Sequence, residues 1–398
     1  MIEILVVEPP DILTDLLMEF RTLFDRRQFR QFRQFSRYIS SSWVSPTRSA
    51  AHLNGIFLEH TNQSNLNRFL RNIPVQEIFR KSVSLINRYS SDSVLAIDDT
   101  ILERSGKHIE GAGWVFDHTQ GKSVWGMQYV TAVVSGKEGI FPLNLELKEE
   151  SGPSKIVMQM DVIKRSIASG LHFSTVVFDS WYFASRLVEF LGKKNKDWIT
   201  EAKSNRTILV NGSWVKLSDY AASLNIRNMA AYSIDGNTYL MKSIITRMKN
   251  ARKVHVIVSM GKNSQKFFVT NRSDWKPAKV IELYVRRWDI ETFHRELKQD
   301  GLKHLYQRKH ESLLGTAKLS LLGALLLEIS AIRSLESHLK IGKGTPGLRF
   351  SSMAMGILVN LFKAMEKKGK GLLDALIESI REPYRSTIGL LGGQIVKV

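Results

Sequence analysis

The stretch SVLAIDDTIL, residues 93–102, decides the fold class of this chain, because its apolar run is followed abruptly by two acidic residues. Four or more consecutive apolar residues bounded by polar ones are typical of a buried strand. A carboxylate at the end of such a strand is costly to bury unless something compensates its charge. The sequence therefore predicts a buried strand that ends at Asp98 and Asp99 beside a polar site.

The segments that follow predict a sheet with helices packed on it. They are, in order, a hairpin at 123–150, a helix at 155–170 ended by Gly170, a strand at 174–180 with Asp179 at its end, a helix at 181–195 and a strand at 197–203. This order is typical of a mixed sheet covered by helices, so we expect an α/β fold. Neighbouring strand ends would bring these acids together.

Composition favours a polyanionic partner. The 398 residues include 57 Lys and Arg against 38 Asp and Glu, which gives a formal net charge of +19 and a pI near 9.9. Such an excess favours nucleic acid first and an anionic membrane surface second, with a basic but otherwise ordinary soluble protein as the alternative. The chain has no cysteine, which excludes disulfides, cysteine-bound zinc and thiol catalysis.

We expect no membrane association and a cytoplasmic location. The first residues, MIEILVVEPPDILTD, are acidic where a secretory signal would be basic. The most apolar run, LSLLGALLLEISAI at 319–332, follows Lys318 and contains Glu328, so it is far shorter than the roughly 20 residues of a spanning helix. It predicts a buried core helix. No Walker-type glycine loop is present, so ATP is not an expected cofactor.

The chain divides into five expected segments. They are a basic helical region at 1–90 that we expect to bind DNA, the first part of an α/β core at 91–204, an inserted β-subdomain at 205–273 with the turn signals NG and DGN, a charged helix at 274–305 that completes the core, and a helical region at 306–398.

The stretch LYVRRWDIETFHRELKQDG, residues 283–301, mixes charges of both signs with aromatic residues in one expected helix. Tyr284, Arg287, Glu291 and Lys298 lie on one narrow stripe of a helix that turns 100° per residue. That face would present a metal-binding carboxylate between cations that contact phosphates. A surface helix stabilised by pairs such as Arg287 with Glu291 is the alternative.

Asp98, Asp179 and Glu291 are therefore the candidate metal ligands, since divalent cations are common partners of carboxylates. A simpler interpretation competes with this one, because an Asp at a strand end is more often a turn or helix cap. Asp179 could cap a helix that begins near Trp181, and Asp98 and Asp99 could simply begin a loop.

The pattern Y-x2-R-x3-E-x6-K, formed by Tyr284, Arg287, Glu291 and Lys298, resembles the signature of bacterial transposases of the insertion-sequence 4 type, which carry a DDE triad. AIDDTILER resembles the first-Asp motif of that family, and VVFDSWY resembles the second. The order of the motifs, the β-rich insertion and the basic helical amino-terminal region are similar too. The resemblance covers residues 90–305.

The resemblance implies a ribonuclease H-like, retroviral-integrase-like core, with a β-rich insertion and helical flanking regions, in which Asp98, Asp179 and Glu291 are catalytic and hold Mg²⁺, for which Mn²⁺ can substitute. It implies that the protein binds the inverted-repeat ends of double-stranded DNA, cleaves them and joins them to target DNA through two metal ions. Tyr284, Arg287 and Lys298 would bind the DNA. The resemblance also implies a homodimer in the DNA synapse, in the bacterial cytoplasm at the nucleoid.

Some alternatives stay open. The family's first motif is D-x-T with an apolar residue two places on, which Asp98, Thr100 and Leu102 match, but Asp99 also precedes Thr100 and remains a rival ligand. A metal-dependent nuclease on the same fold is a second enzymatic function. A DNA-binding protein descended from a transposase and no longer catalytic is a third possibility, against which the intact acids argue.

Overall fold

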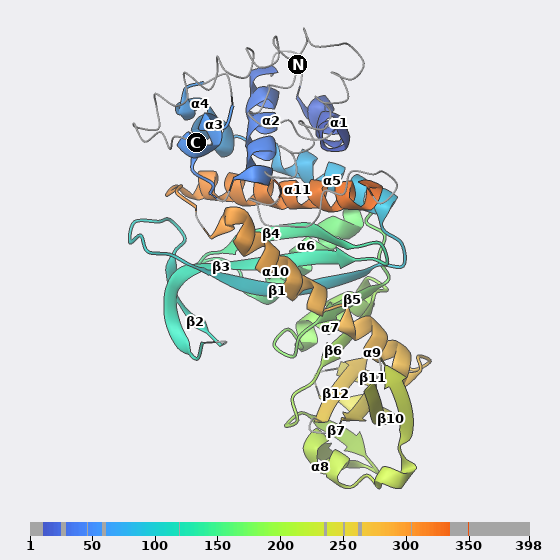
Figure 1. Cartoon of the computed structure of the whole chain (residues 1–398). Coiled ribbons are helices and arrows are strands. Elements are labelled where there is room, and N and C mark those ends of the chain that lie inside the picture. Colours follow the sequence, from blue (N-terminus) through green and yellow to red (C-terminus); the bar gives the residue numbers. More distant parts are fainter. Residues whose placement is uncertain are drawn as a thin grey trace, which may run out of the picture.

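The computed structural model describes residues 11–24, 29–45, 47–57, 61–118, 120–234, 237–249, 251–261, 265–303, 305–334 and Arg349. In this part of the chain, a helical layer covers a large mixed sheet, and the sheet continues into a β-rich lobe (Figure 1). The mixed α/β class expected from the sequence is confirmed. Apart from Arg349, the helices expected after Ser334 lie outside the described residues.

The chain before the sheet is helical. Its described α-helices are α1 (Asp11–Met18), α2 (Phe29–Val44), α3 (Ala50–Gly55), α4 (Gln63–Arg71) and α5 (Val75–Tyr89), with a 3-10 turn at Glu19–Leu23. Apolar residues at helical spacing give α2 an inward face, on which Phe32 and Phe35 are buried against Phe24. Arg30 lies on another face of α2 and is exposed.

The first half of the sheet has mixed strand directions. Its strands are β1 (Val94–Glu103), β2 (Gly113–Asp117), β3 (Lys122–Ser135), β4 (Ile140–Lys148), β5 (Thr175–Phe178) and β6 (Asp197–Glu201). β3 pairs antiparallel with β1, β2 and β4, whereas β5 runs parallel to β1 and β6 runs parallel to β5. Parallel neighbours need a crossover, and the helices α6 (Lys155–Ala168) and α7 (Ser185–Lys193) lie in these connections.

The second half continues the same sheet. Its elements are β7 (Thr207–Val210), β8 (Ser213–Lys216), α8 (Leu217–Ala222), a 3-10 turn (Ile226–Asn228), β9 (Ala230–Ile234), β10 (Asn237–Met248), β11 (Ala251–Met260) and β12 (Gln265–Thr270). β12 pairs with β6, so the β-rich segment extends the main sheet and does not form a sheet of its own. Asn211 and Gly212 both have positive φ in the turn from β7 to β8, as the NG signal predicts.

The helices after the sheet are α9 (Pro277–Val285), α10 (Trp288–Leu297), a π-helical turn (Lys298–Leu302) and α11 (His310–Ser334). α11 contains the apolar run at 319–332 and lies between the amino-terminal helices and β4 (Figure 1). Among the described residues, it is long and apolar enough to cross a membrane, and 83% of its most apolar window is buried within the molecule. The predicted buried core helix is confirmed.

The two charges of this apolar run are compensated inside the fold. Lys318 donates to Oδ1 of Asn144 at 3.1 Å and lies 3.5 Å from a carboxylate oxygen of Glu146. Glu328 accepts from the backbone N–H of Ile140 at 3.0 Å. These contacts join α11 to β4, because a buried charge is tolerated only with a partner.

Strand alternation divides the hydrophobic core into two clusters, one on each face of the sheet. Leu95 and Ile97 of β1 pack in the larger cluster, together with the amino-terminal helices, α6 and α7. Val94 and Ala96 pack in the smaller cluster, together with α9 and α10. Each residue of β1 is thereby assigned to one face by its position in the sequence.

Candidate active site

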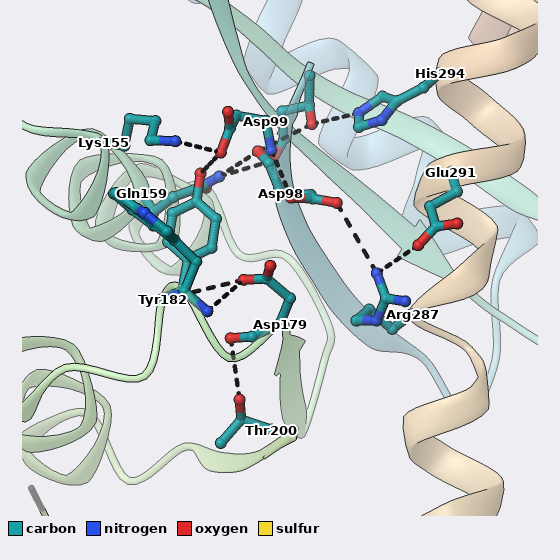
Figure 2. Close-up of polar contacts among 12 residues, drawn as sticks. Asp98, Asp99, Lys155, Gln159, Asp179, Tyr182, Thr200, Arg287, Glu291 and His294 are labelled. Atoms are coloured by element: carbon teal, nitrogen blue, oxygen red, sulfur yellow. Dashed lines mark hydrogen bonds and ion pairs between the residues drawn. The ribbon is translucent and has the colours of Figure 1, made fainter. Parts of the chain in front are cut away.

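Alternation along β1 sends the two adjacent acids to opposite faces of the sheet. Asp98 follows Ala96 on the face that α10 covers, and Asp99 follows Ile97 on the face that α6 covers. Figure 2 shows this division, with Asp98 turned toward Arg287 and Asp99 turned toward Lys155. Of these two rival ligands, Asp98 is the one on the side of Glu291.

The prediction that β1 ends at its acids is wrong. β1 continues to Glu103, because all ten of its residues pair with β3, and Asp98 lies opposite Thr131. The strand that does end here is the parallel neighbour β5, whose last residue, Phe178, pairs with Ile97. Asp179 follows directly and has the parity of Val177, which packs on the α10 face. The end of β5 thus brings Asp179 next to Asp98.

Asp179 closes a turn and does not cap a helix. Its Oδ1 accepts from the backbone N–H groups of Trp181 at 3.0 Å and Tyr182 at 3.3 Å. Its backbone carbonyl accepts from the hydroxyl of Thr200 on β6 at 3.1 Å. The helix expected from residue 181 begins only at Ser185, so that prediction is wrong in its start. The turn fixes the Asp179 side chain through backbone donors alone.

The single helix expected at 283–301 is also broken. α9 ends at Val285, α10 begins at Trp288, and the helix changes to a π-helical turn at Lys298. Tyr284 therefore lies on α9, whereas Glu291 lies on α10. Its ring is 4% exposed and packs edge-on against Phe268, with the ring centroids 5.0 Å apart.

Lys298 lies at the far end of α10 from Arg287. Its ammonium is partly buried, and burial lowers the pKa of Lys298, while the carboxylates of Asp117 and Glu103 oppose that shift. Asp117 is the last residue of β2, and Glu103 is the last residue of β1. Lys298 thus faces the β2 edge of the sheet.

Buried polar contacts hold α10 beside the backbone of Asp98 on β1. Nε2 of His294 lies 2.8 Å from Oγ1 of Thr131, which itself donates to the backbone carbonyl of Asp98 at 3.1 Å. From the other face, the amide of Gln159 donates to the same carbonyl and to that of Thr131, both at 2.9 Å. Burial lowers the pKa of His294 to about 3, so this link uses a neutral imidazole.

Arg287 connects two of the three candidate acids. Its Nη1 is 2.7 Å from Oε1 of Glu291 and 3.9 Å from Oδ2 of Asp98 (Figure 2). The Arg287 side chain is 10% exposed, whereas that of Glu291 is 40% exposed. The predicted helical pair of Arg287 with Glu291 is present, and the same guanidinium also reaches the strand.

Asp98 carries the most perturbed carboxyl of the site. Burial, and next the negative charge of Asp179, raise the pKa of Asp98 to about 7, while Arg287 opposes the shift. Burial also raises the pKa of Asp179. Two carboxylates that repel each other in a partly buried place are short of positive charge, which is the condition that a bound cation relieves.

The donor atoms suit a hard divalent cation, because carboxylate oxygens are its preferred ligands. Among the described residues, however, no three His, Asp or Glu side chains are grouped so that they could hold a metal ion as they lie. Asp179 is near enough for its charge to raise the pKa of Asp98, and Glu291 pairs with Arg287. The residues fit a metal in their chemistry, and in this arrangement Arg287 supplies the positive charge.

Asp99 has a separate set of partners that the sequence did not indicate. Its carboxylate accepts from Lys155 and from the hydroxyl of Tyr182, both at 2.8 Å, and from the amide of Gln128 at 2.6 Å. Lys155 also lies 3.8 Å from the ring centroid of Trp181. Helical periodicity predicted α6, but which of its residues reach β1 depends on packing.

Comparison with known proteins gives a family match. The family model "Transposase DDE domain" matches residues 89–326, which is more than half of the chain. None of the curated proteins compared matches the chain.

Two solved structures are similar at low identity. One is described as the piggyBac transposase synaptic complex with hairpin DNA, with 9% identity, a TM-score of 0.48 and coverage of 95% of this chain and 84% of that one. The other is described as the Drosophila P element transposase strand transfer complex, with 11% identity, a TM-score of 0.25 and coverage of 90% and 94%.

Proposed function

The chain belongs to the transposase DDE domain family, and from that premise we propose that it is a DDE transposase of the bacterial insertion-sequence 4 type. It binds the inverted-repeat ends of its transposon and catalyses metal-dependent DNA cleavage and strand transfer. The observation that supports this most directly is the convergence of Asp98, Asp179 and α10, which carries Glu291, on one face of the sheet.

The strand arrangement supports a ribonuclease H-like core. β1, β3 and β4 form an antiparallel meander, and β5 and β6 add to the other side of β1 in parallel. The first acid lies on the first strand, the second follows β5, and the third lies on a later helix. This is the distribution that the resemblance implies.

All three acids are metal ligands in this proposal. Asp98 and Asp179 would hold Mg²⁺ or Mn²⁺ between β1 and β5, and Glu291 would complete the ligand set from α10. When bound, such ions would activate the attacking oxygen and stabilise the leaving oxygen in an in-line displacement at phosphorus. His294 and Gln159 keep the backbone at Asp98 in place, and the backbone donors of Trp181 and Tyr182 orient Asp179.

The partners follow from the same proposal. The net charge of +19 on this chain favours the binding of double-stranded DNA. Arg287 and Lys298, at the two ends of α10, contact the DNA phosphates. Tyr284 is buried in this arrangement, so it would reach DNA only after a local rearrangement. A homodimer assembles on two DNA ends, in the bacterial cytoplasm at the nucleoid.

Cleavage of a labelled duplex that carries the transposon end, with Mg²⁺ or Mn²⁺, tests the proposal. Wild type should cut and join, whereas Asp98→Ala, Asp179→Ala and Glu291→Ala should each lose about a hundredfold or more of the rate while still binding the duplex. Asp161→Asn on the exposed side of α6 is the matched control and should cut like wild type.

The outcomes separate the alternatives. Equal cutting by all variants would refute the triad assignment. Binding without cutting by wild type would favour a DNA-binding protein without catalysis, and cutting without joining would favour a nuclease. Asp99→Asn should retain cutting better than Asp98→Asn, because Asp99 is bound by Lys155 and Tyr182 on the other face of the sheet.

A further inference from the structure

One cationic side chain, Arg287, lies close to two acids of the candidate active site. Arg287 lies within 2.7 Å of Glu291 and 3.9 Å of Asp98, so its guanidinium stands between a strand acid and a helix acid. A metal ion that shared these two acids would need the same space. It would also gain little attraction there, because a positive charge next to a bound guanidinium is repelled.

The position of Arg287 is supported on several sides. Its guanidinium carbon lies 4.9 Å from the ring centroid of Trp288 and 5.7 Å from that of Tyr284. Trp288 is 51% exposed, so the ring that covers the guanidinium on one side belongs to the molecular surface. Nε of Arg287 is buried without a hydrogen-bond partner among the described residues, so the pairing seen here leaves one donor of the fork unused.

A phosphate is the ligand that can compete for this guanidinium. Arg donates two parallel hydrogen bonds to a phosphate, and it does so more favourably than in a single-point contact with one carboxylate oxygen. Glu291 is held by one Nη1 contact and is 40% exposed, so its side chain is free to rotate once the contact is lost. Withdrawal of Arg287 toward the exposed side would release Glu291 and leave Asp98 without a cationic partner beside the negative charge of Asp179.

We infer that Arg287 is a substrate-operated gate on the metal site: without DNA it neutralises Asp98 and Glu291 and weakens metal binding, and a DNA phosphate draws it away so that the metal site completes. The inference rests on the proposed function, because it takes the three acids as metal ligands. It adds control of metal binding to the phosphate contact proposed for Arg287, and its consequence is that metal and DNA bind with positive coupling.

Mn²⁺ binding to the full-length protein, followed by the loss of the free-Mn²⁺ electron paramagnetic resonance signal, tests the gate without any turnover. Without DNA, Arg287→Gln should bind Mn²⁺ about tenfold or more tightly than wild type, since coupling between sites is typically about 5- to 150-fold. A short mixed-sequence duplex should tighten Mn²⁺ binding by wild type by a similar factor and should change Arg287→Gln little. Asp179→Asn with the same duplex corrects for Mn²⁺ held by DNA alone.

The wild-type protein provides a second, independent measurement. Binding is reciprocal, so Mn²⁺ should tighten duplex binding by the same factor by which the duplex tightens Mn²⁺ binding. This comparison keeps the inference testable if Arg287→Gln does not fold.

Equal Mn²⁺ affinity of wild type with and without duplex, or of wild type and Arg287→Gln without duplex, would overturn the gate. If in that case Asp98→Asn and Glu291→Gln still abolish Mn²⁺ binding, the proposed metal site stands and only the gate fails. If Mn²⁺ binding is unaffected by loss of the acids, the proposed function itself fails.

Discussion

At the scale of single residues, the site depends on which way each side chain points. Asp98 and Asp99 are adjacent and chemically identical, yet one faces Arg287 and the other faces Lys155 and Tyr182. Side chains along a strand alternate between the two faces of the sheet, so neighbouring acids point to opposite faces. Ala96 packs on the α10 face and Ile97 on the other, and this determines the face of each acid that follows. A shift of one residue in β1 would exchange their roles.

His294 gives a prediction at this scale. Burial lowers the pKa of His294 to about 3 in the folded protein, whereas an unfolded His has a pKa of about 6.5. Between these values the unfolded chain binds more protons, so acidification from pH 6.5 destabilises the fold by up to about 1.4 kcal/mol per pH unit. We expect His294→Gln to remove this term, so that between pH 7 and pH 5 wild type loses about 2 kcal/mol more stability than the variant.

Urea denaturation of both proteins at the two pH values measures this difference. Other titrating groups, Asp98 among them, contribute to both proteins and cancel in the comparison. Parallel pH dependence of wild type and His294→Gln would show that burial does not hold the histidine neutral in the folded protein.

At the scale of elements, the breaks between helices matter as much as the helices. On either side of the break between α9 and α10, Tyr284 is buried against β12 and Arg287 lies near Asp98 of β1. The close packing of α11 against α4 is a second feature at this scale. A Cβ added at Gly315 would lie 2.0 Å from the backbone carbonyl oxygen of Leu70 in α4, so the two helices touch at their backbones.

Gly315→Ala should therefore destabilise the protein by about 1–2 kcal/mol, although Ala normally favours a helix over Gly by about 1 kcal/mol. Thermal unfolding measures the effect as a fall in Tm. The matched control is Gly192→Ala in α7, where an added Cβ meets no atom within 4 Å and a neutral or slightly stabilising effect is expected. A Tm for Gly315→Ala at or above that of Gly192→Ala would contradict the contact between α4 and α11.

At the scale of the whole molecule, the two main features are one continuous sheet and a large positive charge. The sheet joins the acid-bearing strands to the β-rich lobe through the pairing of β6 with β12, so the lobe and the site share one scaffold. The positive charge is distributed widely. Arg30, Arg33 and Arg68 line a hollow of about 450 Å³ between α2 and α4 together with Gln31 and Asn65, far along the chain from the site.

DNA binding should therefore weaken steeply with salt, by a factor of about 10³–10⁵ between about 50 and 200 mM if six to ten phosphates are contacted. Fluorescence anisotropy of a labelled duplex over this range gives the slope of log affinity against log salt. Arg30→Gln, in the hollow between α2 and α4, should reduce this slope by about one. Lys193→Gln on the exposed end of α7 is the matched control, and an unchanged slope for Arg30→Gln would exclude the hollow from the DNA surface.

The sequence by itself determined the order of the elements and the residue types available at the candidate site. The apolar runs, the turn at Asn211 and Gly212, the buried helix α11 and the acids Asp98, Asp179 and Glu291 can all be read from it, because periodicity and residue type act over a few neighbouring positions.

Only the tertiary structure decided that β1 runs past its acids, that Asp179 sits in a turn, that the helix at 283–301 breaks, and that Arg287 stands between Glu291 and Asp98. Three of these depend on partners far away in the chain, because β3 extends β1 by hydrogen bonds, β12 packs on Tyr284, and Asp98 lies near Arg287. The turn at Asp179 is local, since its donors are the backbone N–H groups of Trp181 and Tyr182. Local sequence fixes which groups are available, but long-range packing fixes which of them meet.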